Sequence, residues 1–128
     1  MAASDAAGAI RVVTSADDGQ LVQLRRGEAL RLVLSDTAGT GYGWQIEHND
    51  ARLLAPTGQS THQLRARAMP PGAEQQSLAL VVGGPLEVSF LFRAVGVGSG
   101  ELRLRHWRPW EGPRSIDRRF KLSVRVVS

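Results

Sequence analysis

Arg108-Pro109-Trp110 combines side chains suited to non-covalent binding. Tryptophan and arginine are the residue types most enriched in the hot spots of protein interfaces, and a proline in the turn lowers the ordering cost of binding. Two interpretations stay open at this point: the indole of Trp110 stands free for a partner, or it folds back onto the body of the domain. Either way, the chemistry that this segment indicates is contact rather than catalysis.

A second segment of interest covers residues 37–44 and holds three glycines and two threonines before its aromatic end. Glycines let a backbone bend sharply and approach another surface closely. The segment is therefore either a tight turn or a contact loop, and its composition alone favours the turn. Gly83-Gly84 forms another loop of bare backbone between two expected strands.

The residues that serve catalysis or metal binding elsewhere are not arranged for either task here. The three histidines, His48, His62 and His106, lack the spacing of metal ligands. His106 shares an expected strand face with leucines, which makes it a core or boundary residue. No serine stands in a Gly-x-Ser-x-Gly elbow, and the chain has no cysteine. We therefore expect no enzyme activity, no metal and no cofactor.

Length and charge bound the organisation of the chain. With 128 residues, we expect one folded domain over residues 9–128 after a disordered N-terminal segment at residues 1–8. The net charge of +4 comes from arginines that are spread through the strands, which argues against nucleic acid as a partner. No segment approaches the ~20 apolar residues of a membrane span, and the first residues do not resemble a signal peptide. We therefore expect no membrane partner.

Apolar and polar residues alternate along most of the chain, and this period of two predicts β-strands with one buried face. Turn signals separate the runs at roughly eight to twelve residues, and no window shows a helical period. The predicted fold class is all-β, an immunoglobulin-like antiparallel β-sandwich of about 7–8 strands. Breaks are expected at Pro56-Thr57-Gly58 and at residues 96–100. The runs lie at residues 10–13, 20–24, 30–34, 44–47, 52–55, 61–68, 78–80, 86–92, 101–107 and 120–126.

Connections at alternate strand ends of an antiparallel sandwich meet at the same end of the molecule. The segment at residues 37–44, Gly83-Gly84 and Arg108-Pro109-Trp110 are therefore expected to form one binding edge.

These three segments together resemble the chagasin family, the immunoglobulin-like protein inhibitors of papain-like cysteine peptidases. The family shows Asn-Pro-Thr-Thr-Gly-Tyr in an early loop, Gly-x-Gly-Gly in a middle loop and Arg-Pro-Trp in a late loop. The motifs align, in that order, with residues 37–42, with residues 81–84 and with Arg108-Pro109-Trp110. The resemblance covers about residues 10–127.

The resemblance implies reversible, non-covalent blockade of a papain-like active site. The early loop would enter the cleft as a wedge, with Thr40 offering a hydrogen bond and with Tyr42 and Trp44 bracing it from below. The middle loop would run along the substrate groove, Trp110 would stack on an aromatic side chain, and Arg108 would steer by charge. The implied peptidase-binding residues are Gly39, Thr40, Gly41, Tyr42, Val82, Gly83, Gly84, Arg108, Pro109 and Trp110.

Four positions depart from the family motifs. Thr37 and Ala38 replace the asparagine and the proline, Gly39 replaces the first threonine, and Val81 replaces the first glycine of the middle motif. Loss of the threonine hydroxyl at Gly39 is expected to lower the affinity or change the target. Because proline stiffens a loop, its loss is expected to leave the early loop less pre-organised.

An immunoglobulin-like adhesion or assembly module, binding a protein or a glycan through the same loops, is the alternative function. It explains the aromatic loop but not the joint occurrence of three motifs. The expected partner is a papain-like cysteine peptidase, of a host or of the same organism, and the chain is expected to be a monomer. Exported bacterial members of the family favour a periplasmic or secreted location.

Overall fold

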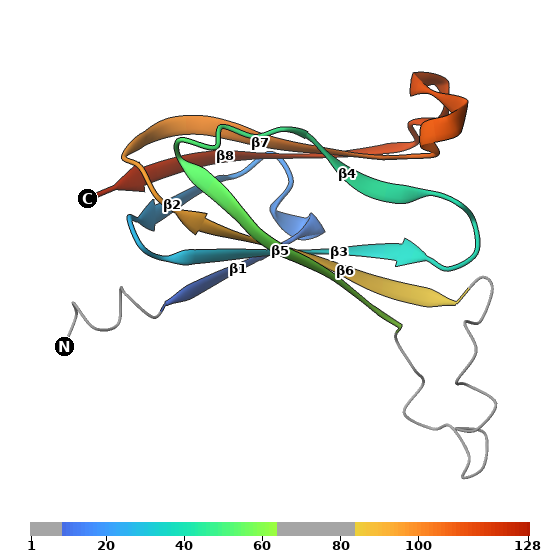
Figure 1. Cartoon of the computed structure of the whole chain (residues 1–128), viewed down its shortest axis with the longest axis horizontal. Coiled ribbons are helices and arrows are strands. Elements are labelled where there is room, and N and C mark those ends of the chain that lie inside the picture. The colour runs from blue at the N-terminus through green and yellow to red at the C-terminus, as the bar shows by residue number, and fades with distance from the viewer. Residues whose placement is uncertain (1–8, 64–83) are drawn as a thin grey trace, which may run out of the picture.

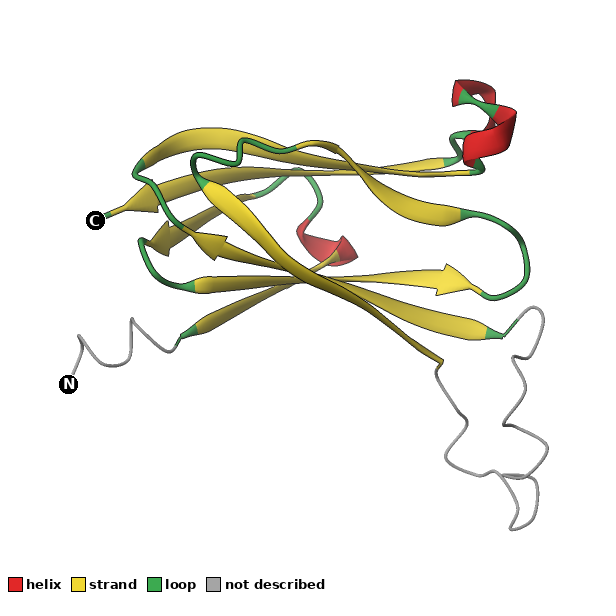
Figure 2. Cartoon of the chain, in the orientation of Figure 1, coloured by secondary structure: helices red, strands yellow, loops and turns green. Residues whose placement is uncertain are grey.

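The structure is a computed structural model that describes residues 9–63 and 84–128. In these residues, eight strands form two four-stranded sheets that face each other, and the remaining elements are short 3-10 turns (Figures 1 and 2). The predicted all-β sandwich is confirmed. Residues 1–8 and the strand expected at residues 78–80 lie outside the described residues.

The order of the strands differs from their order in the chain. One sheet runs β1-β3-β6-β5 and the other runs β2-β8-β7-β4. The elements are β1 (Ile10–Thr14), η1 (Ser15–Asp17), β2 (Leu21–Arg25), β3 (Ala29–Thr37), β4 (Gly43–His48), β5 (Leu54–Gln63), β6 (Pro85–Ala94), β7 (Gly98–Trp107), η2 (Pro109–Glu111), η3 (Pro113–Ser115) and β8 (Arg118–Val127).

Two edge pairings are parallel, although the other pairs are antiparallel as predicted. β1 pairs in parallel with β3, and β2 pairs in parallel with β8. Between β1 and β2 the chain changes sheet through η1, where the side chains of Thr14 and Asp17 cap each other's backbone. This first pair of strands therefore covers one edge of each sheet.

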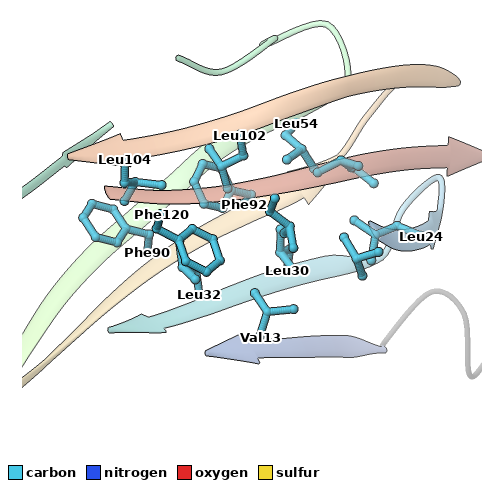
Figure 3. Packing of buried hydrophobic residues seen from close by; sticks show 14 of the residues in the cluster. Val13, Leu24, Leu30, Leu32, Leu54, Phe90, Phe92, Leu102, Leu104 and Phe120 are labelled. Carbon is cyan, nitrogen blue, oxygen red and sulfur yellow. The ribbon is translucent and has the colours of Figure 1, made fainter. Parts of the chain in front are cut away.

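The core is made by the inward-facing residues of the strands, as the alternation predicts. Leu30 and Leu32 of β3 and Phe92 of β6 are buried to 3% exposure or less, and they face Leu104 of β7 and Phe120 of β8 (Figure 3). Each such side chain contributes roughly 1.5–3 kcal/mol by leaving water. The packed interior fixes the spacing of the two sheets and hence the positions of the loops that join them.

Of the two predicted breaks, one was wrong and the other is confirmed in part. Pro56-Thr57-Gly58 lies inside β5, whereas the break predicted at residues 96–100 is the connection at residues 95–97 between β6 and β7. β5 runs through Pro56 because it is an edge strand with a register shift between Pro56 and Gly58, where the missing N–H of proline is not needed. β7 already begins at Gly98. A Cβ at Gly98 or at Gly100 would stand 2.9 Å from the side chain of Leu53, so these glycines give that leucine room to pack.

The strand directions divide the connections between two ends of the molecule. At one end of the molecule, two strands finish, β3 and β7, and two strands start, β4 and β6 (Figure 1). We call this end the loop pole and define it as residues 38–42, Gly84 and residues 108–117. β1 begins and β8 ends at the opposite end. In the described ranges, no helix is long and apolar enough to cross a bilayer.

Candidate functional site

The loop pole joins the described parts of the three sequence motifs. The N–H of Ala38 donates to the carbonyl oxygen of Gly84 at 2.8 Å, which links the early loop to the middle loop. The Nε of Arg108 donates to the carbonyl oxygen of Thr40 at 2.9 Å, which links the early loop to the late loop. The structure therefore brings these segments to one edge. Val81, Val82 and Gly83 lie outside the described residues.

The early loop presents backbone rather than side chains. Gly39 and Gly41 are exposed and have φ angles of +80° and +81°, a left-handed conformation that favours glycine. The hydroxyl group of Thr40 donates to the carbonyl oxygen of Thr37 at 3.2 Å and accepts the N–H of Tyr42 at 3.1 Å. Because this hydroxyl closes the loop internally, the hydrogen bond that Thr40 was expected to offer a partner is already made within the chain.

The late loop carries the indole of Trp110, which is 70% exposed. Of the two interpretations left open by the sequence, the free indole is the one that the structure shows. One edge of the ring nevertheless lies against the early loop, because a Cβ at Gly41 would stand 2.7 Å from Cη2 of Trp110. The loop itself is held by the buried Ser115, whose hydroxyl accepts the N–H of Arg108 at 2.9 Å.

Arg108 connects the late loop to the early loop of the pole. Besides its bond to Thr40, its guanidinium group lies 4.6 Å over the ring of Tyr42, and its Nη1 pairs with Oε2 of Glu111 at 3.2 Å. The expected role was steering by charge. Since these contacts engage the guanidinium group and Glu111 balances its charge, the structure favours a role in joining the loops.

An aromatic floor lies beneath the early loop. Tyr42 stacks on the ring of His106 with centroids 5.1 Å apart, and Trp44 lies 5.0 Å from the same ring. The indole N–H of Trp44 donates to the carbonyl oxygen of Ser35 at 2.9 Å. Tyr42 and Trp44 therefore brace the loop from below, as expected, and His106, which is 5% exposed, is the buried histidine that the strand pattern predicted.

Two carboxylates that contact His106 beneath the early loop escaped the sequence analysis. Asp36 and Asp117 bind the two ring nitrogens of His106, at 2.7 Å and 2.6 Å. Asp36 was detectable, because it continues the inward alternation of Leu30, Leu32 and Leu34 and so had to be a buried carboxylate. Asp117 stands outside any alternating run, and nothing in the sequence pairs it with His106.

Gly39, Gly41 and Trp110 are exposed at the pole. In residues 9–63 and 84–128, no group of three or more histidine, cysteine or acidic side chains could hold a metal ion. Outside the pole, the hydrogen bond from the exposed Arg52 lowers the pKa of Asp50. What the pole offers a partner is the exposed backbone of two glycines beside an exposed indole.

The two facing sheets place the chain in the class of immunoglobulin-like β-sandwiches. The sequence model of the chagasin family peptidase inhibitor I42 matches residues 23–124. The chain therefore belongs to the chagasin family, which confirms the resemblance of the motifs. Because members of this family are inhibitors, the prediction that the chain is not an enzyme is also confirmed.

Solved structures share the fold at low sequence identity. The cysteine protease inhibitor EhICP2 from Entamoeba histolytica is 21% identical, with a TM-score of 0.73 over 94% of this chain and 97% of that one. Amebosin, solved in solution, is 22% identical, with a TM-score of 0.63 over 93% and 98%. PbICP-C, solved in complex with falcipain-2, is 17% identical, with a TM-score of 0.51 over 94% and 91%. A comparison with curated protein sequences finds no match.

The bond from Ala38 to Gly84 changes the meaning of one departure from the family motif. Proline has no N–H, so Ala38→Pro removes this bond and leaves the carbonyl oxygen of Gly84 without its partner. We expect the substitution to weaken peptidase inhibition by about 1–2 kcal/mol, or roughly 5- to 30-fold, although it restores the family residue. Inhibition constants for papain measure the effect. Ala38→Gly keeps the N–H and serves as the control, and equal constants for both variants would contradict the prediction.

Proposed function

We propose that this protein is a reversible, non-covalent, competitive inhibitor of papain-like cysteine peptidases that places the loop pole in the active-site cleft. The observation that carries the proposal is the joining of the glycine backbone at Gly39 and Gly41 with the indole of Trp110 in one hydrogen-bonded edge. Membership of a family of peptidase inhibitors supports it. So do the relatives of the same fold that are described as a cysteine protease inhibitor and as bound to falcipain-2.

The early loop acts as the central wedge. Since Gly39 and Gly41 have no side chains, the backbone around Thr40 can approach a catalytic thiol and imidazole closely. The wedge resists cleavage because its peptide bonds are held by internal hydrogen bonds away from attack geometry. In this arrangement Pro109 and Trp110 contact the leaving-group side of the cleft. The edge at Val82, Gly83 and Gly84 follows the substrate groove, where an added strand would find backbone partners.

The pre-formed edge also explains how a small contact can bind tightly. An inhibitor of this kind buries about 800 Å² on each partner. Arg108 and Ser115 already fix the late loop, and Ala38 ties the early loop to Gly84, so little ordering is needed on binding. The affinity then depends on the few residues that enter the cleft.

Titration of active papain with the protein tests the proposal. We expect competitive inhibition at nanomolar to micromolar protein, with the inhibitor recovered at full length by mass spectrometry after long incubation. Papain whose thiol carries a bulky covalent blocker should bind much more weakly. Absence of inhibition at micromolar protein would overturn the proposal, and equal binding to blocked papain would favour the adhesion or assembly module.

We further propose that the protein acts as a monomer on a host or endogenous peptidase, in the periplasm or outside the cell. One pole fits one cleft, so a second copy is not needed for inhibition. Light scattering after size exclusion tests the monomer, and cell fractionation tests the location. A stable dimer, or protein confined to the cytoplasm, would contradict the corresponding part.

A further inference from the structure

His106 lies at the centre of a buried charged cluster beneath the loop pole. Its Nε2 is 2.7 Å from Oδ1 of Asp36 on β3, and its Nδ1 is 2.6 Å from Oδ1 of Asp117, between η3 and β8. The side chains of His106 and Asp36 are each 6% exposed, whereas that of Asp117 is 49% exposed. The ring therefore connects three parts of the domain: β7, which carries it, β3, and the segment that leads into β8.

Both contacts call for a proton on the ring. A neutral imidazole has one N–H and can donate to one carboxylate, which would leave a lone pair facing the other carboxylate oxygen. The imidazolium form donates to both. Oδ1 of Asp36 also accepts the N–H of Thr37 at 2.8 Å, so this atom already acts as an acceptor. The geometry thus fits a His106 ring that carries both protons.

The charges around the ring agree with that form. Asp36 and Asp117 supply two negative charges, and Arg118 on β8 supplies one positive charge. Nη2 of Arg118 lies 3.3 Å from Nε2, and because a protonated Nε2 cannot accept its N–H, that group donates instead to the carbonyl oxygen of Ser35 at 3.4 Å. Tyr42 from the early loop and Trp44 from β4 cover the ring without adding charge. An imidazolium makes the cluster neutral, and loss of its second proton leaves one uncompensated negative charge in a buried place, which is costly.

The cluster is connected to the loops that bind. The ring of His106 is the surface on which Tyr42 stacks, and Arg108 lies over Tyr42 while holding Thr40. We propose that doubly protonated His106 is a positioning residue, which bridges Asp36 and Asp117 and thereby sets the height and orientation of the early loop. Its effect on inhibition rests on the proposed function, but the state of the ring does not.

Nitrogen-detected NMR of the ring tests the first half without any peptidase. We expect both ring nitrogens of His106 to carry protons that lie in hydrogen bonds to the two carboxylates, with the exposed His48 as the internal comparison. In Asp117→Asn, which replaces the charged acceptor of Nδ1, the signals of Tyr42 and of the Arg108 side chain should shift. A ring with a single proton, or Tyr42 signals that stay unchanged in Asp117→Asn, would overturn the proposal.

Inhibition of papain by three variants tests the second half. His106→Phe keeps an aromatic floor without an N–H, Asp117→Asn removes the more exposed carboxylate, and His48→Gln is the control on β4. Each inhibition constant is divided by the wild-type value at the same pH, which cancels the pH dependence of papain. We expect a roughly 10-fold weakening for His106→Phe, because the bridge between Asp36 and Asp117 that positions the early loop is then lost.

Asp117→Asn keeps the proposal testable if His106→Phe does not fold, since its side chain is half exposed. For this variant we expect a smaller weakening than for His106→Phe, because Asp36 still holds the ring through Nε2. Wild-type inhibition constants in both variants would overturn the proposal. If the wild type itself fails to inhibit, the proposed function fails, while the NMR experiment still decides the role of His106.

Discussion

Trp110→Ala weakens the inhibition of papain by about 2–4 kcal/mol, or roughly 30- to 1,000-fold, if the loop pole enters the cleft. The indole is 70% exposed in the free protein, yet one edge rests on Gly41, so its orientation is set before binding. An aromatic side chain that is exposed and already oriented loses little entropy when it is covered. Truncation removes this buried contact without opening a cavity in the free protein.

The stability of the domain separates this effect from misfolding. We expect thermal unfolding of Trp110→Ala to stay near that of the wild type, because the indole lies outside the core. Val97→Ala is a control at the opposite end of the molecule, where an apolar side chain is 58% exposed. It should leave the inhibition constant unchanged. Inhibition by Trp110→Ala within threefold of the wild type would place the late loop outside the contact.

Gly41→Ala is expected to weaken inhibition about 10- to 100-fold by displacing the indole. A Cβ at this position would lie 2.7 Å and 2.9 Å from two ring atoms of Trp110, and the exposed ring can move only by leaving its place over the early loop. Inhibition constants and thermal unfolding measure the two consequences separately. The loss should appear in inhibition more than in stability, because the displaced ring is a surface group.

Gly19→Ala is a matched control for this prediction. Gly19 has the same φ of +81°, but nothing lies within 4 Å of its added Cβ. Both substitutions therefore carry a similar backbone strain of roughly 1–2 kcal/mol, and only Gly41→Ala meets the indole. In a Trp110→Ala background, Gly41→Ala should cost much less than in the wild type. Additive losses in this double-mutant cycle would show that the two residues act independently.

The sequence predicts the strands well because burial of one face imposes a period of two. Leu30, Leu32 and Leu34 point inward and are almost fully buried, as the alternation requires. Alternation does not encode strand direction, however, so the parallel pairing of β1 with β3 and of β2 with β8 could not be predicted. Nor does the composition of Pro56-Thr57-Gly58 show whether these residues form a turn or continue an edge strand through a register shift, as they do in β5.

The candidate site, too, could be predicted from the sequence only in part. The three motifs identify the loops, since glycine, proline and tryptophan report local backbone and exposure. The bonds that fix the loops to each other join residues far apart in the chain: Arg108 and Thr40 are separated by 68 positions, and His106 and Asp36 by 70. Such pairs depend on the packing of both sheets. The sequence therefore could not show that Arg108 connects the late loop to the early loop, or that His106 lies between two carboxylates.

The departure at Ala38 shows the limit of reading a motif residue by residue. Without its proline, the early loop was expected to be less pre-organised. The structure instead shows a backbone bond from Ala38 to Gly84, which a proline could not make. Stiffening within one loop is thus exchanged for a link between two loops, and the consequence for affinity depends on the whole pole.

The start of β1 and the end of β8 lie away from the loop pole, and this separation has a practical consequence (Figure 1). A ten-residue strand such as β8 spans about 33 Å, roughly the depth of a small domain. A bead, a fluorophore or a neighbouring domain attached beyond Val127 would then stand clear of an engaged enzyme. Immobilised through a linker beyond Val127, the protein should serve as an affinity resin that captures its natural target from a mixture, so that the target can be identified.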